Sequence, residues 1–385
     1  MENLSSTYDG GFAKTPWVLL ARLAIVNSIG FSGATIVPIW VASIGTRLDM
    51  PLWYGGSLAT VQLLATSLVN LATPFVFSRV PPTKLAKIAL PLAALSYLFT
   101  QIENPSIVFA AVVFGGAFLG IVLNATNRIV ANSPFVRRGY TIFQFMEGLF
   151  SALFIITATV FVSYVDIFHV YLLNACVCIV GTVLFFYLPT TQISLGADKP
   201  AAQGGFGLPA VVTLFALLIF FIGQNSVLSF SVPLGEVVEL APNLVTSTIS
   251  LGLIVSLGGA ILSEVVGARW GLARPLLAAT SLLIMVFLAM TQAGSAMTFL
   301  IGIIWMMTTT MFVVPYFFTL LARLDPLGKA ASVGPAFLLI GVALGSAMAT
   351  TLTTIWDVSL IGPAAAGALL ISCLLIMAVT RQHVH

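Results

Sequence analysis

Charged residues are scarce in this chain: of its 385 residues only 7% are Asp, Glu, Lys or Arg, whereas 59% are hydrophobic. Soluble globular domains carry about 25% charged residues. The mean hydropathy is +1.10, and apolar residues are spread along the whole length. This composition excludes a soluble globular protein and indicates a polytopic protein embedded in a lipid bilayer.

Histidine and cysteine are scarce too, with three of each. The cysteines fall in apolar stretches without the spacing of a metal site, so we expect no metal, no cofactor and no metal-dependent enzyme. A membrane enzyme would need an intramembrane cluster of His, Asp, Glu or a Ser–His pair, and none is visible. The sequence has no P-loop, which argues against nucleotide hydrolysis. It also has no patch of basic residues interleaved with aromatic ones, which argues against nucleic-acid binding.

Apolar runs long enough to cross a bilayer recur along the chain, since a hydrocarbon core of about 30 Å needs about 20 residues per helix. They predict an all-α integral membrane protein with twelve transmembrane helices. The polar segment before the first run and the length of that run argue against a signal peptide. The predicted helices are residues 16–44, 52–78, 84–101, 106–132, 139–164, 167–188, 208–235, 243–266, 274–291, 295–322, 330–354 and 358–380.

A connection rich in Pro, Gly, Ala and Thr covers residues 189–207 and is typical of a flexible linker. It separates an N-terminal six-helix bundle at 1–188 from a C-terminal six-helix bundle at 208–385. Each half begins with a helix that carries a polar patch followed by a proline, at residues 27–38 and 224–233. We therefore expect two pseudo-symmetric bundles, an organisation common among transporters. A receptor or scaffold would typically carry a longer soluble part.

Basic residues indicate the orientation. If the N-terminus is cytoplasmic, twelve of the fifteen Lys and Arg residues lie on the inner side, only Arg47 lies outside, and Arg22 and Arg128 are embedded. Because cytoplasmic loops are enriched in Lys and Arg, we expect both termini in the cytoplasm. The membrane that we expect is a bacterial inner membrane, with the protein as a monomer.

Of the charged residues, Arg22, Arg128 and Glu147 lie deepest inside predicted spans. An embedded charge costs about 2.5–3.5 kcal/mol on insertion scales, so such residues usually pair or function. Arg128 and Glu147 form either a structural ion pair between two helices or a proton-coupling site with Glu147 as the proton carrier. Arg22 either reaches the interface with its long side chain or adds positive charge to a substrate cavity.

Helical spacing gathers further polar and aromatic side chains on single faces. We expect these faces to surround a central cavity between the bundles, although Trp and Tyr residues more often pack against lipid or protein. Gly116 with Gly120, and Gly341 with Gly345, have the spacing of close helix contacts. The candidate cavity residues are Arg22, Asn27, Gln62, Asn70, Asn124, Gln144, Gln224, Asn225, Trp305 and Tyr316.

The loop that begins at Gly259, GAILSEVVGARWGLAR, resembles the signature of the major facilitator superfamily, Gly-x-x-x-Asp followed by Gly and basic residues. Ala260 stands for the first Gly, Glu264 for the Asp, Gly267 for the second Gly, and Arg269 supplies the base. The first-half copy is more degraded, with Arg79 in the acidic position.

The turn RRGYT, which begins at Arg137 and Arg138, is similar to the basic turn between helices four and five of that family. We interpret these two arginines as markers of the inner side.

The resemblance implies a secondary active transporter that works by alternating access. We expect protons as the coupling ion because Glu147 is the only deeply embedded carboxylate. We expect the substrate to be a small anionic or amphiphilic organic solute, because Arg22 and Arg128 outnumber Glu147 and leave a net positive charge. The alternative is a proton-driven efflux pump for hydrophobic compounds. The drug–proton antiporters of the family carry an Arg early in helix four and a Gly-Pro-rich run in helix five, and this sequence has neither.

Overall fold

The computed structural model describes residues 17–47, 52–77, 79–164, 170–186, 207–292, 294–325 and 327–383, which are helices and short turns without a strand. The predicted linker at 189–207, apart from Gly207, lies outside the described residues, as do residues 1–16. Six helices form the N-terminal half: α1 (Trp17–Arg47), α2 (Leu52–Val76), α3 (Pro82–Phe99), α4 (Pro105–Ala131), α5 (Val136–Tyr164) and α6 (Val170–Phe186).

The C-terminal half has six further long helices, and the short α9 follows the first of them. They are α8 (Leu208–Ser229), α9 (Ser231–Val237), α10 (Pro242–Trp270), α11 (Ala273–Gln292), α12 (Ala296–Leu324), α13 (Lys329–Ile355) and α14 (Ile361–His383), with a 3₁₀ turn, η2 (Val358–Leu360), before the last. Among the described residues, seven helices, α4, α8 and α10 to α14, are long and apolar enough to cross a membrane by length and composition alone. Shorter apolar segments lie in α1, α2 and α6.

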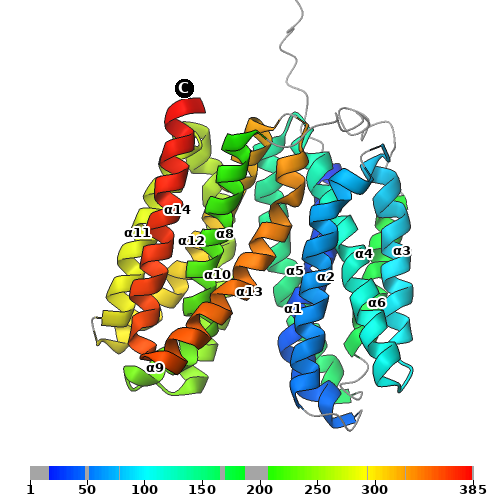
Figure 1. The fold of residues 1–385 in the computed structure, drawn as a ribbon, viewed down its shortest axis with the longest axis horizontal. Coiled ribbons are helices and arrows are strands. Elements are labelled where there is room, and N and C mark those ends of the chain that lie inside the picture. Colours follow the sequence, from blue (N-terminus) through cyan, green and yellow to red (C-terminus); the bar gives the residue numbers. More distant parts are fainter. Residues whose placement is uncertain are drawn as a thin grey trace, which may run out of the picture.

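The helices pack as two bundles that lie side by side (Figure 1). In the first bundle α1 packs on α5, α2 on α4, and α3 on α4 and α6; in the second α8 packs on α13, α10 on α12, and α11 on α12 and α14. The two sets of contacts correspond one to one. The predicted architecture of two pseudo-symmetric six-helix bundles is therefore confirmed.

Local signals in the sequence explain where several helices begin. Asn104 precedes α4, and its side-chain oxygen accepts hydrogen bonds from the backbone N–H groups of Ser106 and Ile107 at 3.0 and 3.3 Å. Pro105 then occupies the first helical position, where a missing N–H leaves no hydrogen bond unmade. Gly328 precedes α13 with a φ of +70°, a conformation that favours glycine.

The predicted helix at 208–235 is interrupted. α8 ends at Ser229, and α9 begins at Ser231, two residues before Pro233. Proline lacks an N–H and its ring clashes with the carbonyl group four residues earlier, which here belongs to Ser229. The break follows from that clash, whereas α1 continues through Pro38.

The two glycine pairs make close helix contacts, as predicted. Gly116 and Gly120 bring α4 against α2, where a Cβ on Gly116 would lie 2.6 Å from the carbonyl oxygen of Gln62. Gly341 and Gly345 bring α13 against α8, where each Cβ would lie 2.6 Å from a backbone carbonyl oxygen. The bundles therefore depend on small residues for close approach of their backbones.

One end of the molecule carries most of the exposed basic side chains and the C-terminus, and we call it the basic end. The bundles converge toward this end, while α13 leans away from α2 toward the opposite end (Figure 1). Its exposed basic residues include Arg79, Lys84, Arg138, Arg269, Arg274, Arg323 and Arg381.

Candidate functional site

An ion-pair cluster joins the two bundles at the basic end. Arg137 and Arg138, at the start of α5, both donate to Oε1 of Glu264 on α10, at 3.1 and 3.3 Å. The side chains of Arg137 and Glu264 are 26% and 28% exposed, so protein atoms shield most of this pair from water. The two arginines therefore do more than mark one side of the membrane, because they hold the bundles together.

Gly267 and Tyr316 lie beside this cluster. The hydroxyl of Tyr316 donates to the carbonyl oxygen of Ser263 at 2.7 Å. A Cβ on Gly267 would lie 3.0 Å from the Arg137 guanidinium and 3.1 Å from the Tyr316 ring, so a side chain at this position would require one of these groups to shift. Contrary to the expectation from sequence, Tyr316 belongs to the surroundings of the ion pair and not to a central pocket. Arg269 is exposed.

A neutral contact joins the bundles through α4 and α13. The side-chain amide of Asn124 donates to the carbonyl oxygen and to Oγ of Ser332, at 3.2 and 3.1 Å, and to the carbonyl oxygen of Asn70 at 3.1 Å. The amide of Asn70 donates in turn to the carbonyl oxygen of Gly120 at 3.3 Å. Asn70 and Asn124 are therefore committed to helix contacts.

Arg79, in the acidic position of the first-half motif, is exposed and forms no ion pair with any described residue. The basic end is thus closed by an ionic contact between α5 and α10 and by an uncharged one between α4 and α13.

A small pocket, with a cavity volume of about 20 Å³, lies at the boundary between the bundles. The N-terminal bundle supplies all the polar groups of its lining, and α12 and α13 supply apolar ones. The lining residues are Asn27, Phe31, Asn127, Tyr140, Phe143, Gln144 and Glu147 from the first bundle and Val314, Phe318, Pro335 and Leu338 from the second.

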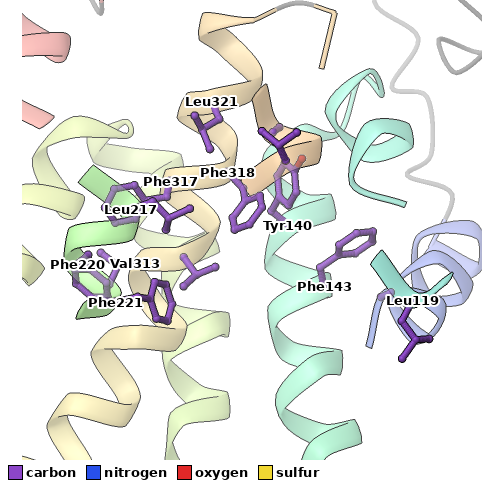
Figure 2. Packing of buried hydrophobic residues seen from close by; sticks show 14 of the residues in the cluster. Leu119, Tyr140, Phe143, Leu217, Phe220, Phe221, Val313, Phe317, Phe318 and Leu321 are labelled. Atoms are coloured by element: carbon purple, nitrogen blue, oxygen red, sulfur yellow. The ribbon is translucent and has the colours of Figure 1, made fainter. Parts of the chain in front are cut away.

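Hydrogen bonds fix the polar wall of this pocket. Oδ1 of Asn27 on α1 accepts from Oγ1 of Thr126 and from Nδ2 of Asn127 on α4, both at 2.9 Å. The Tyr140 hydroxyl donates to the carbonyl oxygen of Asn127 at 3.2 Å. The Tyr140 ring lies against Phe318 of the other bundle, with 5.0 Å between ring centroids (Figure 2). The wall is therefore held in place before any solute binds.

Glu147 is the only charged residue among the described residues that line the pocket. It is half-buried, and it has neither an ion pair nor a hydrogen bond with another described residue. One turn earlier on α5, the amide of Gln144 donates to Sδ of Met311 on α12 at 2.9 Å. Glu147 is thus the free carboxylate of the pocket.

The predicted contact between Arg128 and Glu147 does not form. Arg128 is only 2% exposed and does not line the pocket. It lies three residues before the end of α4 at Ala131, about 4.5 Å from that end at 1.5 Å per residue. Glu147 lies eleven residues after the start of α5 at Val136, about 16 Å deep. The difference in depth of about 12 Å separates their side chains.

Several other predicted cavity residues lie within one bundle. Nε2 of Gln62 donates to the hydroxyl of Tyr97 at 2.9 Å, inside the N-terminal bundle. The amide of Asn225 donates to the carbonyl oxygen of Val342 at 2.7 Å, between α8 and α13. Both amides satisfy helix contacts, so neither faces the pocket.

Gln224 is buried in α8 and Arg22 is half-buried in α1, and neither lines the pocket. Trp305 is 43% exposed and lines a groove formed by α10, α11 and α12 of a single bundle, away from the boundary. Of the candidate cavity residues, Asn27 and Gln144 therefore lie in the pocket with Glu147.

The aromatic lining and Asn127 were not among the candidates. Asn127 lies one turn after Asn124 on α4, and Tyr140 follows the paired arginines in the RRGYT turn, so the sequence indicated weakly that these two residues belong to the site. Phe31, Phe143 and Phe318 carried none, because phenylalanine is abundant in every predicted span, with 28 in the chain.

Comparison with known proteins identifies the family. The profile of the Major Facilitator Superfamily matches residues 22–350. The chain belongs to this superfamily. It is therefore an integral membrane transporter and not an enzyme. No curated protein matches the chain in sequence.

Solved structures of superfamily members and related transporters share the fold. The fucose:proton symporter of E. coli is 13% identical with a TM-score of 0.76, covering 94% of this chain and 98% of that one. A bacterial homologue of the iron transporter ferroportin, in an outward-facing state, is 14% identical with a TM-score of 0.78 over 94% and 99% of the two chains. The human organic anion transporter MFSD10 is 15% identical with a TM-score of 0.68 over 93% and 97%.

Proposed function

We propose that this chain is a proton-coupled secondary active transporter that moves a small amphiphilic organic solute by alternating access. The observation that carries the proposal is the position of Glu147, a free carboxylate in a pocket between the bundles. Intramembrane carboxylates of this kind are found in proton pathways of transporters. The similar fold of a fucose:proton symporter is consistent with proton coupling.

The lining of the pocket favours some solutes over others. Its described residues include amides, aromatic rings and one carboxylate, but no Lys or Arg. The expected preference for an anion depended on a spare positive charge near the site, and neither Arg22 nor Arg128 lines the pocket. We therefore propose a neutral or cationic amphiphile, whose apolar part contacts the rings and whose polar part contacts Gln144 or Glu147.

Efflux of hydrophobic compounds is the second candidate. It is favoured by the aromatic share of the lining, to which Phe31, Tyr140, Phe143 and Phe318 contribute. A single carboxylate that binds either a proton or a cationic solute would give exchange of one for the other.

The state described by the structure supports alternating access. The ionic and neutral contacts both lie at the basic end, where the bundles converge (Figure 1). The positive-inside rule places this end in the cytoplasm, so we propose that both termini are cytoplasmic and that the state is outward-facing. In the same proposal the protein is a monomer in a bacterial inner membrane, and the linker at 189–207 separates the moving bundles.

Purified protein in liposomes that contain a pH-sensitive dye tests the function. Neutral, cationic and anionic amphiphiles are added outside under an imposed pH gradient, and coupled proton flux is recorded. Glu147→Gln should reduce the flux to that of empty liposomes, because the amide cannot carry a proton. Glu236→Gln, which neutralises an exposed acid in the C-terminal bundle, is the matched control and should retain the flux. Unchanged gradient-driven flux in Glu147→Gln would contradict the proposal.

A further inference from the structure

A long apolar groove runs along the outer face of the C-terminal bundle. Two adjoining pockets with cavity volumes of about 250 and 320 Å³ form it, and they share Leu282 of α11 and Trp305 of α12. Helices α10, α11 and α12 supply the described residues that line the first pocket, and α11 and α12 supply those that line the second pocket. The groove is therefore separate from the boundary between the bundles, where the candidate transport pocket lies.

The groove suits a hydrocarbon chain in both surface and length. Its few polar side chains are threonines, and the hydroxyl of Thr308 already donates to the carbonyl oxygen of Ile304 at 2.8 Å. From Pro275 to Ala289 the lining follows fourteen residues of α11, or about 21 Å at 1.5 Å per residue. One leaflet of a bilayer contributes about 15 Å of hydrocarbon, so an acyl chain fits along it.

Two exposed arginines stand at the mouth of the groove, at the basic end. Trp270 and Pro275 line the groove, and Arg269 and Arg274 precede them directly in the chain. Arg269 lies one turn after Val266, another lining residue, so it projects from a neighbouring position of α10. Neither arginine forms an ion pair with a described residue. Their charges are therefore available to a ligand.

We infer that this groove binds an anionic glycerophospholipid. Its acyl chain lies along α11 and α12, and its phosphate contacts Arg269 and Arg274, with Trp270 at the level of the glycerol. Charge complementarity decides the class of lipid, because basic residues beside grooves between transmembrane helices attract anionic headgroups. Tryptophan is also enriched at this depth of the membrane. The inference is independent of the solute that the transporter moves.

Native mass spectrometry of the delipidated full-length protein tests the inference. Phosphatidylglycerol and phosphatidylcholine with identical acyl chains are titrated separately, and bound lipid is counted. Phosphatidylglycerol should bind at least tenfold more tightly. The double variant Arg269→Gln/Arg274→Gln should bind it about thirty-fold more weakly, which corresponds to about 2 kcal/mol for two basic groups at 1.4 kcal/mol per tenfold change.

Matched variants separate the headgroup from the chain. Arg381→Gln removes a charge from the same end of the same bundle, outside the groove, and should bind phosphatidylglycerol as the native protein does. Ala278→Phe fills the groove and should weaken binding of both lipids. Equal binding of the two lipids, an equal loss in Arg381→Gln, or full competition by soluble glycerol 3-phosphate would overturn the inference.

Discussion

The ion pair at Glu264 leads to a quantitative prediction about the conformational equilibrium. Glu264→Gln removes the negative charge that Arg137 and Arg138 share, at 3.1 and 3.3 Å from the same oxygen. The two arginines then face each other at the start of α5 without a neutralising partner. The basic end should consequently open more often.

The size of the effect follows from the exposure of the pair. Ion pairs at the protein surface contribute about 0.2–1 kcal/mol each. Two such pairs on a carboxylate whose side chain is 28% exposed lie near the upper part of that range. A loss of about 1–2 kcal/mol shifts the ratio of open to closed basic ends by about five- to thirty-fold.

Distances between labels at the basic end report this ratio. Lys84→Cys on α3 and Arg381→Cys on α14 place exposed labels on different bundles, in a background without the native cysteines. Single-molecule energy transfer in nanodiscs then counts closed and open molecules. High ionic strength should shrink the difference between Glu264→Gln and the native protein, because salt screens partly exposed charges.

Two controls decide whether the pair is responsible. Glu236→Gln removes an equal charge from an exposed site outside the cluster and should leave the distribution unchanged. In a double-mutant cycle, Arg137→Gln should have a smaller effect in the Glu264→Gln background than in the native protein. Additive effects, or an unchanged distribution in Glu264→Gln, would refute the reasoning.

Two further predictions concern packing and the outer groove. Gly120→Val should lower the thermal midpoint of unfolding, because the new side chain meets the carbonyl group of Thr66 and overpacking costs about 1–3 kcal/mol. Gly258→Val is the control: a Cβ at Gly258 meets open space, so this variant should unfold at the temperature of the native protein. Trp305→Phe should change the coupled proton flux by no more than twofold, because the Trp305 ring lies in the outer groove and not in the transport pocket. For the same reason, lipids with brominated acyl chains should quench the fluorescence of Trp305 in the native protein. A loss of flux in Trp305→Phe would instead place this residue in the transport path.

Much of the fold could be predicted because the bilayer restricts the choices. A spanning segment must satisfy its own backbone hydrogen bonds, so each long apolar run had to be a helix, and the runs are visible in the sequence. The interruption at Phe230 could be anticipated only in part, because proline breaks some helices and is accommodated in others. Pro233 ends α8 early, whereas α1 continues through Pro38.

The candidate site was harder to predict because contacts depend on depth as well as on helical face. Glu147 was predicted as an embedded acid, and in the structure it lines the pocket between the bundles. Its expected partner Arg128 lies elsewhere, because α4 ends at Ala131 and α5 begins at Val136, which places the two side chains about 12 Å apart in depth. α4 ends one residue earlier and α5 begins three residues earlier than predicted, and the earlier start of α5 places Glu147 deeper than expected.

The sequence by itself determined that the chain spans a membrane, that it consists of two related halves, and which few charges are embedded, since each property is local to a run of residues. The tertiary structure alone decided which side chains meet across the boundary between the bundles. Glu264 meets Arg137 and Arg138 of the other bundle, Asn124 meets Ser332, and Glu147 remains free in the pocket. These contacts join residues more than a hundred positions apart, and the packing of the two bundles brings them together.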